Sequence, residues 1–339
     1  MSSTNPPFFT VIIPLYNKRA FILQAVQSVL TQRFDDFELL VIDDGSSDGS
    51  SDILEEMISD PRLRIIRQKN LGGAGSQARN SGMVEARGDW FAFLDADDIW
   101  FPNHLTELAA IIEHAGQPAL ISTRPIELPA GTIASPDLSN VSEIREVDYF
   151  REAGRQIGQN NCSSSAIHRE VFGRLGGFAY HDAGEDLEYW ARIALLYPFV
   201  LSSRITSIYY RGTGGVMETS ATRTEHKFEQ KIESLSDVSP SLAMLAKKAA
   251  DRPELLTRSD IQAYINGRLY NGMLINIRQG SARKARALRK LMIGRVGVQA
   301  HLATAAAWLP ESVLKFLMYF APLLLRSART FYRKHSWRG

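Results

Sequence analysis

The stretch Trp90-Phe91-Ala92-Phe93-Leu94-Asp95-Ala96-Asp97 decides the fold of this chain. Its first five residues form an uninterrupted apolar run, which is typical of a strand buried on both faces of a sheet. Two carboxylates, Asp95 and Asp97, follow where that strand should end. Such a pair favours a divalent cation such as Mg²⁺ or Mn²⁺, whose other ligands can be substrate phosphates. The alternative is that Asp95, Asp97 and Asp98 cap a helix that begins near Pro102.

Strand-like and helix-like stretches alternate around this segment, as expected for an α/β domain. Apolar runs predict further strands at residues 10–14, 39–42 and 63–66. Apolar pairs recur every four residues between Phe21 and Leu30, which predicts an amphipathic helix. The later expectations are helices from about residue 51, at 78–84 and at 186–196, strands at 119–122 and 205–210, a loop at 125–140, and mostly helix beyond 223.

The composition is that of an ordinary globular protein, with 45% hydrophobic and 22% charged residues in a chain of 339. The single cysteine, Cys162, excludes an internal disulfide framework and a cysteine-based zinc cluster. We expect it to be a buried packing residue in a reducing compartment. Residues 1–7 show neither the basic nor the apolar region of a signal peptide, so no secretory signal is expected.

A second acidic pair, Asp43 and Asp44, follows the strand predicted at 39–42. Ligands of open α/β sheets bind beyond the carboxyl ends of the strands, which is where both acidic pairs should lie. The glycine-rich turn at 72–75, followed by Arg79, could offer backbone amides and a cation to a phosphate. The alternative for Asp43 and Asp44 is a role in turn formation and helix capping.

Four motifs occur in a fixed order: Pro14-Leu15-Tyr16-Asn17, then Val-Ile-Asp-Asp-Gly-Ser-Ser-Asp-Gly at 41–49, then Asn70-Leu71-Gly72 with Ala78-Arg79-Asn80-Ser81-Gly82, and finally Phe93-Leu94-Asp95-Ala96-Asp97-Asp98. Together they resemble family 2 glycosyltransferases, densely over residues 8–116 and more thinly to about 212. The resemblance implies a GT-A fold, which is a Rossmann-like α/β architecture with a mixed, mostly parallel sheet flanked by helices. It also implies a nucleotide-diphosphate sugar donor, usually UDP-linked, a divalent cation, and inversion at the anomeric carbon.

The resemblance further implies roles for individual side chains. Those expected around the donor nucleotide are Pro14, Tyr16 and Asn17 as pocket lining, Asp43 and Asp44 at the uracil or ribose, and Gly72 and Arg79 near the nucleotide and phosphates. Asp95 is expected to contact the ribose and the metal, and Asp97 to bind the Mn²⁺ or Mg²⁺ ion that bridges the diphosphate.

Glu185 and Asp186 resemble the acidic pair that precedes a helix in this family. An inverting reaction needs a carboxylate that takes the proton of the acceptor hydroxyl. We expect Asp186 to be this base and Glu185 to orient the acceptor. The alternative is that both acids only begin a helix, where negative charge is favourable. Relatives often have a histidine shortly after a Tyr-Arg pair, whereas Tyr210–Gly215 contains none.

The C-terminal part is basic. Residues 278–339 hold 13 Lys and Arg against one acid, Glu311. The apolar tract at 303–325 is interrupted by prolines and charges, so a spanning helix is not expected. Aromatic and basic residues around it favour an interfacial helix on anionic lipid. Packing against the body of the protein is the alternative, and no nucleic-acid motif accompanies the charge.

We therefore expect three regions: a nucleotide-sugar-binding half at 8–116, an acceptor-binding and catalytic half at 117–220, and a basic helical extension at 221–339. The expected function is transfer of a sugar from a UDP-sugar to a glycan or lipid-linked acceptor in surface polysaccharide synthesis, in the cytoplasm at the inner face of the membrane. A non-catalytic nucleotide-sugar-binding module is disfavoured because Asp95, Asp97 and Asp186 are intact. A sugar nucleotidyltransferase is disfavoured because its basic glycine-rich signature is absent near the N-terminus.

Overall fold

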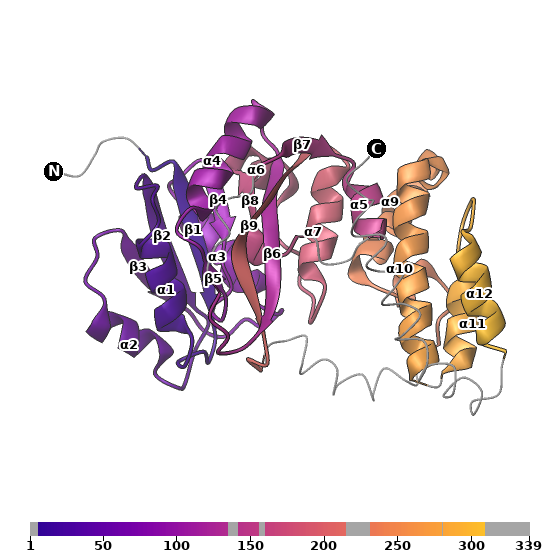
Figure 1. The fold of residues 1–339 in the computed structure, drawn as a ribbon, viewed down its shortest axis with the longest axis horizontal. Coiled ribbons are helices and arrows are strands. Elements are labelled where there is room, and N and C mark those ends of the chain that lie inside the picture. Colours follow the sequence, from indigo (N-terminus) through magenta and orange to yellow (C-terminus); the bar gives the residue numbers. More distant parts are fainter. Residues whose placement is uncertain (1–5, 135–141, 156–159, 215–230, 280, 309–339) are drawn as a thin grey trace.

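The computed structural model describes residues 6–134, 142–155, 160–214, 231–279 and 281–308. One nine-stranded mixed sheet runs through residues 9–211 in the order β3-β2-β1-β4-β8-β6-β9-β5, with β7 paired to β9. Figure 1 shows this sheet running from β3 near one end of the molecule to β6 and β9 near its middle, with helices α10 to α12 at the other end. The predicted α/β class with a C-terminal helical extension is confirmed.

The first half of the sheet is parallel, with β1 between β2 and β4 and with β3 beyond β2. Its elements are β1 (Phe9–Leu15), α1 (Ile22–Leu30), β2 (Phe37–Asp43), α2 (Ser50–Met57), β3 (Leu63–Arg67), α3 (Ser76–Glu85) and β4 (Trp90–Phe93). Every residue of β2 and β4 is buried, as their continuous apolar runs predict. All seven elements were expected from the sequence, with shifts of a few residues at their ends.

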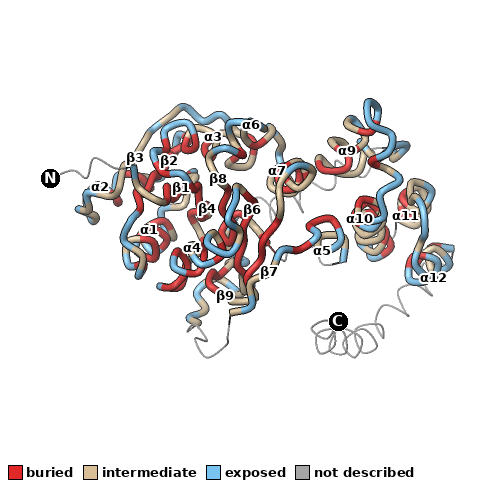
Figure 2. The backbone as a smooth tube through the Cα atoms, turned by 90° about the horizontal axis from the view of Figure 1, so that it is seen from above, coloured by how far each residue is buried: buried red, intermediate tan, exposed pale blue. Residues whose placement is uncertain are grey.

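Side chains of the central strands alternate between two hydrophobic cores. Val11 and Ile13 of β1 pack on the side of α1 and α4 (His104–Ala115), whereas Ile12 packs on the side of α3. This period of two is what a strand covered by helices on both faces requires. In Figure 2 the central strands β2 and β4 are therefore red, while exposed residues of the surrounding helices are pale blue.

The second half of the sheet is mixed. Its elements after β4 are β5 (Ile99–Trp100), α4, β6 (Leu120–Pro129), β7 (Ile144–Val147), α5 (Tyr149–Arg155), a 3₁₀ turn at Cys162–Ser164, β8 (Ser165–His168), α6 (Arg169–Leu175), α7 (Glu185–Ala194) and β9 (Phe199–Arg211). The loop predicted at 125–140 is wrong at its start, because residues 125–129 continue β6. They pair with β9 from Pro125 opposite Ser207 to Pro129 opposite Arg211, after a register shift at Arg124. Such an irregularity is where a strand tolerates proline.

The C-terminal helices are α9 (Pro240–Asp251), α10 (Ser259–Arg278), α11 (Ala282–Lys290) and α12 (Val298–Ala306). Helix α10 lies close against α5, because a Cβ at Gly267 would stand only 2.0 Å from the carbonyl oxygen of Gly154. The extension is thus packed onto the sheet domain through α5. Within the part of the chain that the structure describes, no helix is both long and apolar enough to cross a membrane.

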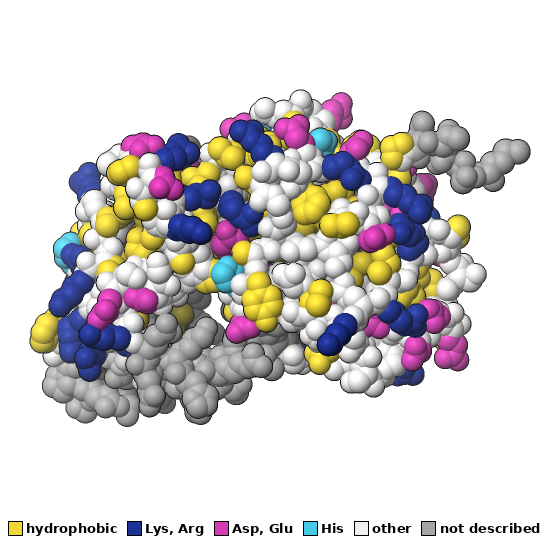
Figure 3. Space-filling view, turned by 180° about the vertical axis from the view of Figure 1, so that it is seen from behind, with side chains coloured by type: hydrophobic (Ala, Val, Ile, Leu, Met, Phe, Trp, Pro, Cys, Tyr) yellow, Lys and Arg dark blue, Asp and Glu magenta, His cyan; other side chains and the backbone are white. Residues whose placement is uncertain are grey.

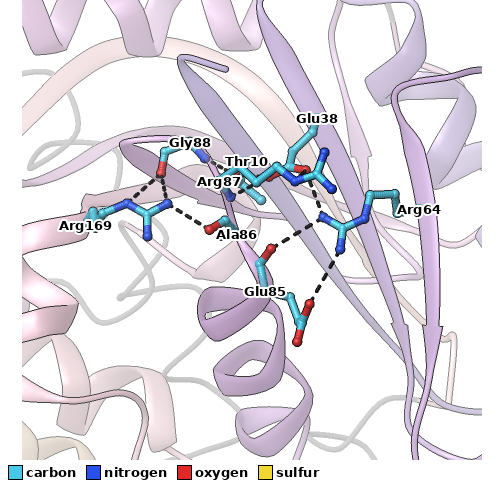
Figure 4. Close-up of polar contacts among 8 residues, drawn as sticks. All are labelled: Thr10, Glu38, Arg64, Glu85, Ala86, Arg87, Gly88 and Arg169. Atoms are coloured by element: carbon cyan, nitrogen blue, oxygen red, sulfur yellow. Dashed lines mark hydrogen bonds and ion pairs between the residues drawn. The ribbon is translucent and has the colours of Figure 1, made fainter. Parts of the chain in front are cut away.

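A buried polar network holds the amino ends of the parallel strands in register (Figure 4). The Glu38 carboxylate at the start of β2 accepts hydrogen bonds from Thr10 of β1 at 2.8 Å and from Arg64 of β3 at 3.1 Å. Thr10 Oγ1 in turn accepts the backbone N–H of Gly88, whose carbonyl accepts from Arg169 at 2.7 Å. The backbone ladders of β1 to β4 carry the same register on to the opposite, carboxyl ends of these strands.

Candidate active site

The carboxyl ends of β1, β2 and β4 meet at one edge of the sheet. Leu15 lies opposite Asp43, and Ile12 lies opposite Phe93, so the segments following these three strands start side by side. These segments carry the motifs singled out in the sequence. The structure therefore brings the predicted donor-binding residues to one edge, which is where α/β sheets bind ligands.

Asp43 and Asp44 are both buried and have different tasks. Asp43 Oδ1 accepts the backbone N–H of Ser46 at 2.8 Å, which is the turn role that the sequence left open. Asp44 Oδ1 instead accepts the Gln68 side-chain amide at 2.6 Å and the Leu71 backbone N–H at 3.1 Å. Asp44 thus ties the end of β2 to the segment that enters the glycine turn.

Asn17 joins the first motif to the second. It adopts a left-handed conformation with φ of 50°, and its side-chain oxygen accepts the Ser47 backbone N–H at 2.8 Å. Its own backbone N–H donates to Ser46 Oγ at 3.0 Å. Beside it, the Tyr16 side chain is half exposed. Pro14 lies within β1, opposite Ile42.

The glycine turn is covered by an aromatic ring that the sequence did not indicate. Gly72 and Gly73 have φ values of 71° and 74°, which only glycine adopts readily. A Cβ at Gly72 would stand 3.0 Å from the hydroxyl of Tyr180, and one at Gly73 would stand 3.1 Å from its ring. Tyr180 is nevertheless 60% exposed. An exposed aromatic ring therefore lies against the glycine turn. Nothing in the sequence around Tyr180 marks this contact, which is seen only in the folded protein.

Arg79 is buried and links the two halves of the site. Its Nη2 lies 2.5 Å from Asp95 Oδ1, and its Nη1 lies 3.3 Å from Glu185 Oε1. Its guanidinium also lies 5.6 Å from the ring centre of Phe178. The guanidinium thus joins the end of β4 to the start of α7, which are far apart in the sequence. The expected contact of Arg79 with a phosphate stays a prediction.

Glu185 and Asp186 form the first turn of α7, which follows Gly184 in a left-handed conformation. Asp186 Oδ1 accepts the Leu187 backbone N–H at 2.7 Å. Burial, and then the charge of Asp186, raise the pKa of Glu185 to about 7. Burial also raises the pKa of Asp186. Both acids lie in the first turn of the helix, which agrees with the alternative that they only begin it. In addition, Arg79 contacts both Glu185 and Asp95 and so holds the two carboxylates near each other.

Asp97 is held by two residues to which the sequence assigned no role. The Lys18 ammonium lies 2.7 Å from Asp97 Oδ2, and Thr213 Oγ1 donates to the same oxygen at 2.7 Å. Lys18 directly follows the Pro14–Asn17 motif, and this position next to the motif is the one feature of the sequence that could have indicated a role for it. Thr213 lies in the glycine-rich stretch just after β9.

Asp98 anchors the acidic segment to the rest of the sheet. Its carboxylate accepts from Ser163 Oγ at 2.5 Å and from the Tyr210 backbone N–H at 3.0 Å. Burial, and then the nearby Asp95 and Asp97, raise the pKa of Asp98 well above its ordinary value. The alternative that these acids cap the next helix is wrong, because α4 begins at His104 without a side-chain cap.

The donor set of this edge fits a hard divalent cation. Asp95 and Asp97 offer carboxylate oxygens one residue apart, and a cationic group, the Lys18 ammonium, already pairs with Asp97. In the described ranges, no group of three or more His, Cys, Asp or Glu side chains could hold a metal by itself. A cation bound here would therefore take one or two carboxylates and complete its shell with phosphate oxygens and water, as Mg²⁺ usually does.

The comparisons with known proteins assign the class. The family model for glycosyl transferase family 2 matches residues 10–176, which include all of the motifs at this edge. This part of the chain belongs to glycosyl transferase family 2, so the resemblance seen in the sequence is confirmed.

Curated relatives match the donor half of the chain. The glycosyltransferase GlyG of Streptococcus pneumoniae serotype 4 is 36% identical over 100 residues, which are 29% of this chain and 33% of that protein. The succinoglycan biosynthesis protein ExoW of Rhizobium meliloti is 48% identical over 101 residues, which are 28% of this chain and 31% of that protein. The aligned part of the chain thus spans about a third of the length of each of these two relatives.

Solved structures resemble the whole fold. Staphylococcus aureus TarS 1–349, in complex with UDP-GlcNAc, has a TM-score of 0.54 at 15% identity and covers 91% of both chains. The mannosyltransferase PcManGT of Pyrobaculum calidifontis, in complex with GDP-Man and Mn²⁺, has a TM-score of 0.50 at 18% identity, covering 89% of this chain and 88% of that one. At these identities the likeness shows the fold, which is the predicted GT-A architecture with C-terminal helices.

Proposed function

We propose that this protein is an inverting glycosyltransferase that moves a sugar from a UDP-sugar to a glycan or lipid-linked acceptor. The observation that carries the proposal is the Arg79 bridge, which joins Asp95 of the motif edge to Glu185 at the start of α7. Donor-side and acceptor-side carboxylates are thereby held at one place, as a group transfer requires. The family of residues 10–176 supports the same reaction class.

In this proposal, residues 8–116 bind the donor and residues 117–220 bind the acceptor. Tyr16, Pro14 and Asn17 line the nucleotide pocket, and Asp44 holds the base or ribose while Asp43 shapes the loop. The nucleotide sugars named with TarS and PcManGT support a donor of this class. The name of ExoW supports a role in surface polysaccharide synthesis.

Asp97, with Asp95 beside it, would hold Mn²⁺ or Mg²⁺ at the donor diphosphate. Such an ion supplies Lewis-acid stabilisation of the negative charge that develops on the leaving nucleotide. The protein keeps Asp95 in position through Arg79 and through its backbone N–H, which donates to Ser163 Oγ at 3.0 Å. The Gly72 turn offers backbone amides on the same side of the donor.

Asp186 would take the proton of the acceptor hydroxyl, and Glu185 would orient that hydroxyl. The Arg79 contact fixes Glu185, which suits an orienting group better than a group that must change its charge in every turnover. The raised pKa of Asp186 makes its carboxylate a stronger base than an ordinary aspartate. Glu185 is itself buried, so an acceptor hydroxyl bound beside it would be shielded from bulk water.

The experiment is a screen of UDP-, GDP- and dTDP-sugars with Mn²⁺ or Mg²⁺, following nucleotide release and the anomeric configuration of the product. We expect Asp97→Asn and Asp186→Asn to lower turnover by at least a hundredfold, because each removes a group worth several kcal/mol at the transition state. Lys247→Met, a change on the exposed face of α9, should leave turnover unchanged. Unaltered turnover of Asp97→Asn with chelator present would refute the proposed metal role. Donor binding without turnover, or release of pyrophosphate, would favour the binding module or the nucleotidyltransferase.

We also infer that the protein works in the cytoplasm, peripherally at an anionic membrane surface. Most of the apolar tract predicted at 303–325 lies outside the described residues. In the described part, dark blue basic side chains gather at the end of the molecule that carries α11 and α12 (Figure 3). Val298 and Leu302 are exposed one turn apart on α12, and exposed Trp308 follows. This combination of charge and apolar surface fits anionic lipid. Co-sedimentation with phosphatidylglycerol vesicles but not with phosphatidylcholine vesicles is the expected result, and equal recovery with both would contradict it.

A further inference from the structure

Three separate segments meet at the Asp97 carboxylate. Asp97 Oδ2 accepts from the Lys18 ammonium at 2.7 Å and from Thr213 Oγ1 at 2.7 Å. The same ammonium donates to the Thr213 carbonyl oxygen at 3.0 Å. The Lys18 and Asp97 side chains are only 17% and 14% exposed, so the ion pair is partly shielded from water. These contacts form a closed triangle between the segments that follow β1, β4 and β9.

Lys18 reaches Asp97 from a firmly held backbone. Its own backbone N–H donates to Ser50 Oγ at 3.0 Å, and the preceding Asn17 accepts from Ser47 at 2.8 Å. The anchoring residues belong to the segment that carries Asp43 and Asp44. The side chain of Lys18 therefore connects the segment proposed to bind the nucleotide with the carboxylate proposed to bind the metal.

The position of Thr213 is set by its contacts with Lys18 and Asp97, whereas the residues before it are held by other bonds. Tyr210 is fixed by its hydrogen bond to Asp98 at 3.0 Å. Gly212 and Gly214, on either side of Thr213, have φ values of 87° and 72°. Glycine adopts positive and negative φ values about equally readily, so a change of backbone conformation at these two positions costs little free energy. A shift in the position of Thr213 therefore causes little backbone strain at its two neighbours.

We propose that Lys18 is an internal cation that neutralises Asp97 until a divalent metal ion takes over the carboxylate. Asp97 Oδ2 already accepts two donors, the Lys18 ammonium and Thr213 Oγ1, so a metal ion that binds this oxygen must displace one of them. The ammonium is the one displaced, because its positive charge repels that of the metal ion. Metal binding therefore displaces Lys18 and removes its hydrogen bond to the Thr213 carbonyl oxygen. The displaced ammonium stays at the same edge, where it can pair with a donor phosphate. This inference rests on the metal role proposed for Asp97.

The first test is Mn²⁺ binding by the full chain without nucleotide, followed by electron paramagnetic resonance of the unbound ion. Lys18→Met keeps the aliphatic stem and removes the competing charge, so we expect Mn²⁺ to bind about three- to tenfold more tightly, as expected for loss of a partly shielded ion pair. Thr213→Val removes one donor to Asp97 without changing the charge and should tighten binding about twofold. Lys247→Met removes an equal charge from exposed α9 and should leave the affinity unchanged.

The second test is hydrogen exchange at the amides of residues 212–214, measured by mass spectrometry. Mn²⁺ should speed exchange there in the unmodified protein. In Lys18→Met, exchange should already be fast, and Mn²⁺ should add little. This readout separates displacement of Lys18 from a mere change in the electrostatic potential at the metal, which would leave exchange at 212–214 unaltered.

The outcomes distinguish the two proposals. If the unmodified protein binds Mn²⁺ and Lys18→Met changes neither affinity nor exchange, Lys18 is not a competitor and the metal role of Asp97 stands. If neither protein binds Mn²⁺, with or without UDP, the metal role of Asp97 and the inference about Lys18 are both overturned. Donor turnover without metal would then be measured separately.

Discussion

Replacing Arg79 with methionine should destabilise the protein strongly, and more so in alkaline than in acidic solution. Arg79 is buried and faces Asp95 at 2.5 Å and Glu185 at 3.3 Å. Removing one partner from a buried ion pair costs about 3–5 kcal/mol, because an uncompensated charge is left behind. Methionine retains much of the apolar volume of the arginine side chain, so the loss of stability comes mainly from the missing positive charge.

The pH dependence follows from Glu185. Its pKa in the folded protein is about 7, against an ordinary value of 4.5, so the folded state holds a proton there that the unfolded state loses. Stability therefore falls as the pH rises from 4.5 to 7 and then levels off. Without Arg79, whose charge lowers the pKa of Glu185, this decline should continue above pH 7. Because one pKa unit corresponds to about 1.4 kcal/mol, we expect the loss at pH 8.5 to exceed that at pH 5.5 by about 1–2 kcal/mol.

The assay is urea unfolding followed by tryptophan fluorescence at these two pH values. Arg67→Met is the matched control, since Arg67 also contacts two acids, Asp52 and Glu55, but is 47% exposed. It should change stability by no more than about 0.5 kcal/mol. Adding Glu185→Gln to Arg79→Met should reduce the difference between the two pH values, leaving the part that comes from Asp186, whose pKa Arg79 also lowers. An equal loss at both pH values, or a double variant that keeps the full difference, would refute this reasoning.

Three other predictions concern the packing of the fold. Gly267→Ala should lower the stability by about 1–3 kcal/mol, because its Cβ would stand 2.0 Å from the Gly154 carbonyl oxygen. The control is Gly173→Ala, whose Cβ would meet nothing within 4 Å and which should leave Tm unchanged or slightly raised. Burial lowers the pKa of His104 to about 3 from 6.5, so its NMR signals should not titrate between pH 5 and 8. Stability should decline as the pH falls from 6.5 to 3, because only the unfolded state takes up a proton in this range. A titration midpoint near 6.5 would contradict this. Glu38→Leu should cost about 2–4 kcal/mol in thermal or urea unfolding, because it leaves the buried donors of its network unpaired, and a loss below 1 kcal/mol would show that the network is dispensable.

The first half of the fold was predictable because its signals are local. Continuous apolar runs marked β2 and β4, and pairs of apolar residues every four positions marked α1. The second half was less readable. Strand β7 was missed, and residues 125–129 were expected to be part of a loop because the stretch 125–140 is rich in Pro, Gly and Ser. They are a strand only because β9, more than 70 residues later, pairs with them.

The site shows the same division. The sequence by itself indicated the family and the edge of the sheet that carries the motifs, because strand ends and the acids that follow them are written in consecutive residues. It could not indicate that Arg79 bridges Asp95 and Glu185, or that Lys18 pairs with Asp97. The tertiary structure alone decided those partners. Ion pairs form between side chains that the folded backbone brings within a few ångströms, whatever their separation along the chain.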